Sequence, residues 1–139
     1  MPIRIEVKDL MDNRVFSLDA NAMVAQAIDL MIQKNVWSVV VERRGLPEGV
    51  VTEKDVFRRC IGNGLDPKKT PIGSIASVPL ITVGPDTSIK EAMDVMTQKN
   101  IRRVFVVERG KIIGRITQTR LFESMVSVLE DLSLLSSEL

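Results

Sequence analysis

The sequence contains no histidine and no tyrosine, and only one cysteine among its 139 residues. Without histidine, the chain lacks the usual general base, the Ser–His and Cys–His pairs of nucleophilic catalysis, and the commonest metal ligand. The single cysteine, Cys60, excludes an intrachain disulfide and indicates a reducing, intracellular environment. We therefore expect a protein that is not an enzyme, has no metal site and buries Cys60 as a small apolar residue.

A dominant charge and a long hydrophobic run are missing as well. The 19 basic and 18 acidic residues leave a net charge of +1, so no overall field attracts nucleic acid or an anionic membrane. No apolar run approaches the roughly 20 residues that span a bilayer, and residues 1–6 do not resemble a signal peptide. These absences lead us to expect a cytoplasmic protein.

What the sequence does contain is an internal repeat. A shift of 65 residues aligns residues 7–57 with 72–122 without a gap, and 13 of the 51 aligned positions are identical. Chance would give about three identities, so the chain is a duplication of one unit rather than a longer solenoid.

Each copy predicts the same order of elements. A short extended piece (15–18 or 80–83) precedes a helix, which an Asx residue, Asn21 or Asp86, is expected to cap. Asn35 and Asn100 follow a lysine and are expected to end these helices in the left-handed conformation. Two strands joined by a glycine turn come next, and a second helix follows Thr52 or Thr117.

This order predicts a mixed α/β (α+β) fold of tandem β-α-β-β-α repeats related by a pseudo-twofold axis. Three strands with helices on one face leave the other face bare, and two copies can bury these faces together. The expected domains are a first repeat (1–65), a linker (66–71), a second repeat (72–124) and a C-terminal helix (125–139).

A short motif, Gly-x-x-Thr-x-x-Asp, lies between the last strand and the last helix of the first copy as Gly49, Thr52 and Asp55. Together with the duplication, it resembles the cystathionine-β-synthase (CBS) domain pair over about residues 7–125. The resemblance implies a stand-alone regulatory module that binds an adenosine-containing ligand between its repeats, as an energy or metabolite sensor acting on a partner protein. AMP, ADP or ATP is the expected ligand, ahead of S-adenosylmethionine or NAD, and no obligatory cofactor is implied.

The chemistry of the motif suits a nucleoside. A carboxylate accepts hydrogen bonds from vicinal hydroxyls, so Asp55 can bind the ribose diol. Thr52 can donate to a phosphate or the ribose, Gly49 permits a close approach of the backbone, and Lys54 is a weaker candidate for a phosphate. The alternative is structural, because Thr52 and Asp55 also have the spacing of a capping box.

By the pattern of the family, the other repeat completes the site around Asp55. In that pattern, a basic residue at the start of the central strand contacts the phosphates. Strand alternation points Arg102 and Arg103 in opposite directions, and Arg103 is the favoured phosphate contact. The residues implied for the base are Ile81, Thr82 and Val83, with Thr87 and Ile101 nearby.

The second copy departs from the motif. Gly114 and Thr117 are kept, but Arg120 stands where the acid would be. We expect that this copy does not hold a ribose in the same way, although Arg120 could meet a phosphate.

Two further functions remain open. One is a structural or interaction dimer with empty clefts. The other is an RNA- or DNA-binding protein, which no aromatic platform supports. The basic pairs that could serve it are Arg43-Arg44, Arg58-Arg59, Lys68-Lys69 and Arg102-Arg103, of which the middle two are interpreted as solvated surface.

The last segment carries a heptad pattern, with a helix expected to reach about Ser136. It either lies on its own domain or meets a partner helix, and CBS pairs commonly form dimers through their helices, so we expect a homodimer. The seam consists of Leu121, Met125, Val128, Leu132 and Leu135.

Overall fold

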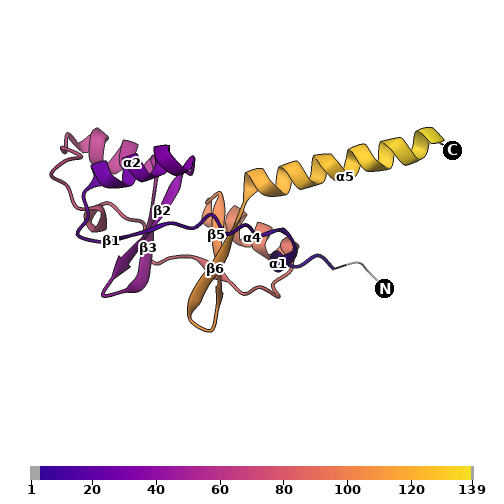
Figure 1. Ribbon diagram of the computed structural model, residues 1–139, viewed down its shortest axis with the longest axis horizontal. Coiled ribbons are helices and arrows are strands. Elements are labelled where there is room, and N and C mark those ends of the chain that lie inside the picture. Colours follow the sequence, from indigo (N-terminus) through magenta and orange to yellow (C-terminus); the bar gives the residue numbers. More distant parts are fainter. Residues whose placement is uncertain (1–3, 139) are drawn as a thin grey trace. The chain divides into compact units, whose positions relative to one another are not determined.

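A computed structural model of the protein describes residues 4–138. The described chain divides into two compact units, Arg14–Ile81 and a second one made of residues 4–13 and 82–138. Each unit holds a three-stranded sheet whose first two strands are parallel and whose last two are antiparallel (Figure 1). The strands are β1 (Ser17–Asp19), β2 (Ser38–Arg43) and β3 (Leu46–Thr52) in the first sheet, and β4 (Thr82–Val83), β5 (Arg103–Glu108) and β6 (Lys111–Thr117) in the second.

The main helices confirm the predicted repeat and its β-α-β-β-α order. Helix α2 (Val24–Lys34) joins β1 to β2, and α4 (Ile89–Lys99) joins β4 to β5. Both end as predicted, because Asn35 and Asn100 adopt the left-handed conformation with φ of 53°. The mixed α/β fold class is therefore confirmed.

The expected caps at the start of these helices are wrong by two residues. The N-cap residues are Met23 and Ser88, not Asn21 and Asp86. Asn21 lies in a turn, where its N–H donates to the Asp19 carboxylate at 2.9 Å, so the chain needs two more residues before it can enter the helix.

The core of the first unit lies between α2 and its sheet. Val24, Ala27 and Met31 of α2 pack with the buried residues Val39 and Val41 of β2. Val40, between them in sequence, is also buried, as expected for a strand that is covered on both faces. Cys60 joins this core with no exposed surface, which confirms its interpretation as a small apolar residue.

In each unit, a segment that lies before the other repeat in the sequence packs against the first part of the repeat. The segment before the second repeat contacts the first repeat, and the segment before the first repeat contacts the second. The Ile72 N–H donates to the Ala22 carbonyl at 2.8 Å, and the Val7 N–H donates to the Thr87 carbonyl at 2.8 Å. The partners in the two bonds differ by 65 residues, so the contacts are equivalent. The segments involved contain α1 (Val7–Leu10) and the 3₁₀ turn η3 (Ile72–Ser74).

An exposed ion pair joins α1 to the segment before α4. Lys8 Nζ lies 2.8 Å from Asp86 Oδ1, and both side chains are exposed. Hydrogen bonding to Lys8 lowers the pKa of Asp86, and hydrogen bonding to Asp86 raises the pKa of Lys8. Both groups are therefore charged at neutral pH, and because they are exposed the pair adds little stability.

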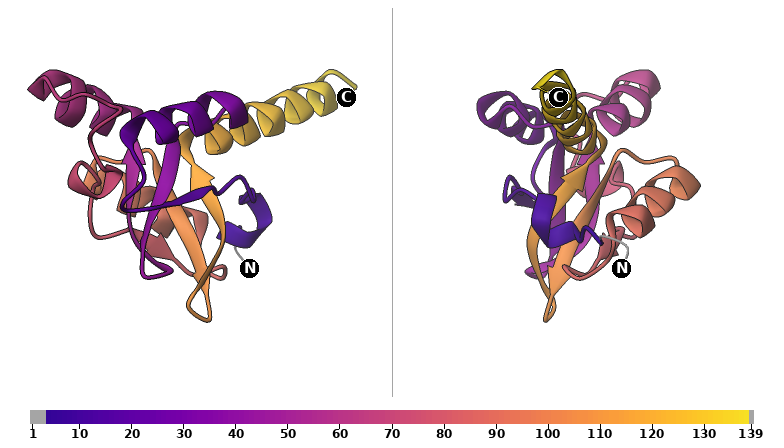
Figure 2. Two further views of the ribbon diagram at one scale, coloured as in Figure 1. Left: turned by 60° about the vertical axis from the view of Figure 1, so that its left-hand side comes forward. Right: turned by 90° about the vertical axis from the view of Figure 1, so that its right-hand side faces the viewer.

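The second helices of the two repeats differ in length and regularity. In the first repeat, α3 (Glu53–Asp55) continues as a π-helical turn over Val56–Cys60 (η1) and a 3₁₀ turn over Ile61–Asn63 (η2). Gly64 then ends the helical segment with φ of 71°. In the second repeat, α5 (Gln118–Glu138) is an unbroken helix of 21 residues (Figure 2).

Candidate functional site

The predicted motif lies where β3 ends and α3 begins. Thr52 is the N-cap of α3, and its Oγ1 accepts a hydrogen bond from the Asp55 N–H at 3.3 Å. In return, Asp55 Oδ2 accepts from the Thr52 N–H at 2.9 Å and from the Thr52 hydroxyl at 3.2 Å. Thr52 and Asp55 therefore form a capping box, which confirms the structural alternative for this pair.

The second oxygen of Asp55 reaches a different segment of the same unit. Asp55 Oδ1 accepts a hydrogen bond from the Ser77 hydroxyl at 2.9 Å, and Arg59 Nε lies 3.8 Å away. The Asp55 residue is only 6% exposed. A buried carboxylate needs hydrogen bonds or an opposite charge, and this one has both.

Arg59 has a larger role than the sequence indicated. Its side chain is 52% exposed, which confirms its interpretation as a surface residue, but its Nη1 also donates to the carbonyl oxygens of Ala76 at 2.9 Å and Ile75 at 3.3 Å. Arg59 and Asp55 thus both hold residues 75–77. Sequence reasoning also missed Ser77, whose partner lies 22 residues away, and no local pattern signals such a contact.

Gly49 explains why residues 77 and 78 come so close to β3. Ser77 pairs with Val50 through two backbone hydrogen bonds, of 2.8 and 3.0 Å. A Cβ added to Gly49 would lie 2.6 Å from Val78 Cγ1 and would overlap the Ser77 carbonyl oxygen. The close approach for which Gly49 was singled out is thus made, in this structure, by the chain itself.

The second repeat builds the equivalent junction from different side chains. Thr117 Oγ1 accepts from the Arg120 N–H at 3.1 Å, so the cap is retained. Arg120 Nε donates to the Leu10 carbonyl at 3.4 Å. Asp12, which is 65 residues before Ser77, accepts from Arg115 Nε at 2.9 Å. Arg120 thus stands at the position equivalent to Asp55, and Asp12 at the position equivalent to Ser77.

The two compact units each hold a part of the predicted ligand set. In the second unit, Thr82 and Val83 form β4 and pair with Phe105 and Val106, so β4 is the neighbour of the strand that begins at Arg103. Arg102, just before that strand, is exposed. The first unit contains Gly49, Thr52, Lys54, Asp55 and Ile81, and the second contains Thr82, Val83, Thr87, Ile101, Arg102 and Arg103.

Neither a metal site nor a membrane segment is found within residues 4–138. The described Cys, Asp and Glu residues include no group of three or more placed to hold a metal ion. None of the described helices combines the length and the apolar character that crossing a bilayer requires.

Both repeats match the same known protein family. The family model for the CBS domain matches residues 7–62 and again residues 72–127. The CBS domain-containing protein YhcV of Bacillus subtilis is 32% identical over 108 residues, which are 78% of this chain and 76% of YhcV.

Two solved structures share the fold at a similar level of identity. The CBS domain protein PAE2072 from Pyrobaculum aerophilum, complexed with AMP, is 28% identical with a TM-score of 0.77, covering 84% of this chain and 90% of that one. A hexameric CBS-CP12 protein from bloom-forming cyanobacteria is 28% identical with a TM-score of 0.80, covering 87% of this chain and 68% of that one.

Proposed function

Because the chain belongs to the CBS domain family, with one CBS domain in each repeat, we propose that it is a regulatory protein that binds an adenine nucleotide of the AMP, ADP or ATP class. The observation that carries this proposal is the AMP complex of PAE2072, whose similarity extends over 84% of this chain. The complete Gly-x-x-Thr-x-x-Asp motif of the first repeat supports it.

In this proposal Asp55 binds the ribose. A carboxylate has about four positions for accepting hydrogen bonds, and Thr52 and Ser77 together occupy three of them. A ribose diol needs two, so it has to displace at least one present donor. The Ser77 hydroxyl is the one that can leave, because the backbone bonds of Ser77 to Val50 hold its segment in place without it.

The remaining predicted residues supply the base and phosphate contacts. The extended residues Ile81–Val83, with Thr87 and Ile101, would surround the adenine. Arg103 would face the phosphates, with Arg102 and Lys54 as further cations. Arg120 replaces the ribose acid in the second repeat, so a single nucleotide per chain is expected.

Regulation would follow from differential binding. A ligand shifts a conformational equilibrium only as far as its affinities for the two states differ, and release of Ser77 from Asp55 offers such a difference. The chain would form a homodimer, and its conformational change would act on an effector protein that binds this dimer. The hexameric state of the CBS-CP12 protein supports self-association in this family.

A second function deserves a test because Asp55 already has a structural task. Its carboxylate is buried and hydrogen-bonded within its own repeat, as it would be in a purely structural dimer that binds no nucleotide. The two functions differ in whether the parent chain binds a nucleotide, and in whether removal of the charge of Asp55 weakens that binding.

The test is calorimetric titration of AMP, ADP and ATP into the full chain and into two variants. Asp55→Asn keeps an acceptor for Thr52 but loses the charge, and we expect affinity to fall about 10- to 100-fold. Arg120→Ala is the matched control at the equivalent position, and we expect it to bind like the parent chain. No binding by the parent chain would favour the structural dimer, and the reverse order of the variants would move the ligand to the second repeat.

A further inference from the structure

Helix α5 extends well beyond its counterpart in the first repeat. The 65-residue shift aligns Gly64, where the first repeat's helical segment ends, with Leu129, whereas α5 runs to Glu138. The family match ends at residue 127. The added turns are therefore not needed for the repeat itself.

The added turns continue an apolar stripe that has no cover among the described residues. Exposed fractions are 56% for Val128, 55% for Leu132 and 60% for Leu135. These residues follow Met125 at spacings of three and four, which is the seam of a coiled coil. Leu129, 60% exposed, widens the stripe on one side.

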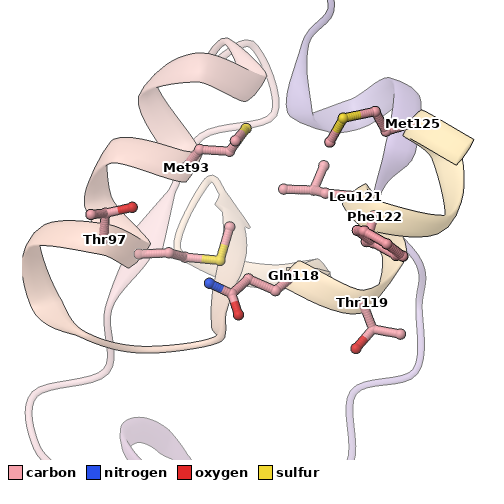
Figure 3. A pocket seen from close by; sticks show the side chains of 8 residues that line it. Met93, Thr97, Gln118, Thr119, Leu121, Phe122 and Met125 are labelled. Atoms are coloured by element: carbon pink, nitrogen blue, oxygen red, sulfur yellow. The ribbon is translucent and has the colours of Figure 1, made fainter.

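The stripe leads into a groove between α4 and the first turns of α5. The groove is a cavity of about 410 Å³, lined mainly by apolar side chains of the two helices (Figure 3). Met93 and Phe122 on its rim are 44% and 65% exposed. The lining residues are Met93, Met96, Thr97, Gln118, Thr119, Leu121, Phe122 and Met125.

The charges of α5 indicate what covers these surfaces. Residues 121–139 contain four acids and no lysine or arginine. The acids Glu123 and Glu130 lie on the side of the helix opposite the seam, by the 100° turn per residue. Phe122, Ser124 and Leu129, which flank the seam, are uncharged, and Asp131, seven residues after Ser124, is the one acid at such a position within residues 121–136. A helix that selects a foreign partner does so through charges at such flanking positions, and these are nearly absent here.

The distribution of acids along α5 sets the direction of pairing. Asp131 lies beside the seam in the second half of the helix, and Arg120 lies in the first turn. Parallel pairing of two copies would bring the acidic halves together. Antiparallel pairing instead places each acidic half beside the partner's first turn, where Arg120 and the positive end of the helix dipole lie.

We propose that α5 pairs antiparallel with α5 of a second copy of this chain, so that Leu132 and Leu135 of each helix cover the partner's groove beside Met125. Leu132 lies seven residues, about 10 Å, beyond Met125 along the helix. When two antiparallel helices overlap over this length, Leu132 of one copy lies opposite Met125 of the other and therefore reaches its groove. The inference deepens the proposed self-association, and nucleotide binding does not depend on it.

The first test measures self-association by sedimentation. We expect Leu132→Glu, which places a charge in the seam, to weaken dimer formation at least about 100-fold. Leu134→Glu is the matched control, because Leu134 is 65% exposed but lies about 160° around the helix from Leu132. A dimer that survives Leu132→Glu would overturn the α5 pairing while leaving the homodimer intact, and a monomeric parent chain would overturn both.

The second test fixes the direction and does not depend on that variant's folding. Met125→Cys with Leu135→Cys should form a covalent dimer on oxidation, whereas each single variant should not. The two cysteines cannot join within one helix, since ten residues span about 15 Å and a disulfide needs Cα atoms within about 7 Å. Cys60 is buried and does not compete. Equal cross-linking by a single variant would show parallel pairing and overturn the proposal, as would the absence of cross-linking in the double variant.

Discussion

Asp55 is shared between two tasks that draw on the same lone pairs. It closes the start of α3 through Thr52, and it holds residues 75–77 through Ser77. If a nucleotide binds there, its ribose competes with the protein's own serine. The affinity for the ligand then contains the cost of breaking the Ser77 hydrogen bond, about 1.5–3 kcal/mol for a bond to a charged acceptor.

Removal of that competitor should strengthen binding. We expect Ser77→Ala to raise the affinity for AMP at least about tenfold and to lower the free energy of unfolding by about 1.5–3 kcal/mol. Ser74→Ala is the control, since the Ser74 hydroxyl donates to the Pro71 carbonyl at 2.7 Å in the same segment without touching Asp55. Titration calorimetry and urea unfolding would measure the two effects. Weaker binding by Ser77→Ala would mean that Ser77 itself contacts the ligand.

At the scale of elements, each sheet depends on a glycine at the middle of its last strand. Gly49 admits Ser77 and Val78, and Gly114 admits Asp12, whose carbonyl oxygen would lie 2.7 Å from an added Cβ. In both places the obstacle is partly backbone, which cannot move like the end of a flexible side chain.

We therefore expect Gly49→Ala and Gly114→Ala each to lower the free energy of unfolding by about 1–3 kcal/mol, because the docked segment must shift. Gly84→Ala should change it by less than about 0.5 kcal/mol, since the nearest atom to an added Cβ there is Thr87 Oγ1 at 3.8 Å. Urea denaturation of the three variants would compare them. If Gly49→Ala proved neutral, the close approach of Ser77 would not be a constraint.

The elements themselves could be predicted because their signals are local. Apolar residues at helical spacing, such as Val24, Ala27, Ile28 and Met31, predict α2, and the same spacing recurs in α4. A lysine followed by asparagine marks where both helices end. The starts of these helices were misplaced because Asn21 and Asp86 favour a turn as much as a cap. The π-helical turn over Val56–Cys60 had no sequence signal.

In the candidate site, only the contacts between residues close in sequence could be predicted. The Thr52–Asp55 capping box follows from a spacing of three residues. The contacts of Asp55 with Ser77 and of Arg59 with Ala76 join segments 22 and 17 residues apart, and only folding brings those together. The ribose role of Asp55 remains a prediction.

At the scale of the whole molecule, the two repeats differ in their motif residue and in the length of their last helix. The first keeps the acid of the motif, Asp55, and ends its helical segment at Gly64. The second replaces the acid with Arg120 and extends its helix to Glu138. The proposals assign nucleotide binding to the first repeat and self-association to the second.

This division predicts that the two tasks can be separated by mutation. AMP at about 100 times its Kd should stabilise the protein by about 2.7 kcal/mol, which for 139 residues raises the Tm by roughly 9 °C. Leu132→Glu should keep that increment although it no longer dimerises, whereas Asp55→Asn should lose about half of it or more at the same AMP concentration and stay dimeric. Thermal unfolding with and without AMP, together with sedimentation, measures both properties in each variant. If Leu132→Glu abolished the AMP increment, binding and pairing would be coupled, and the assignment of one task to each repeat would fail.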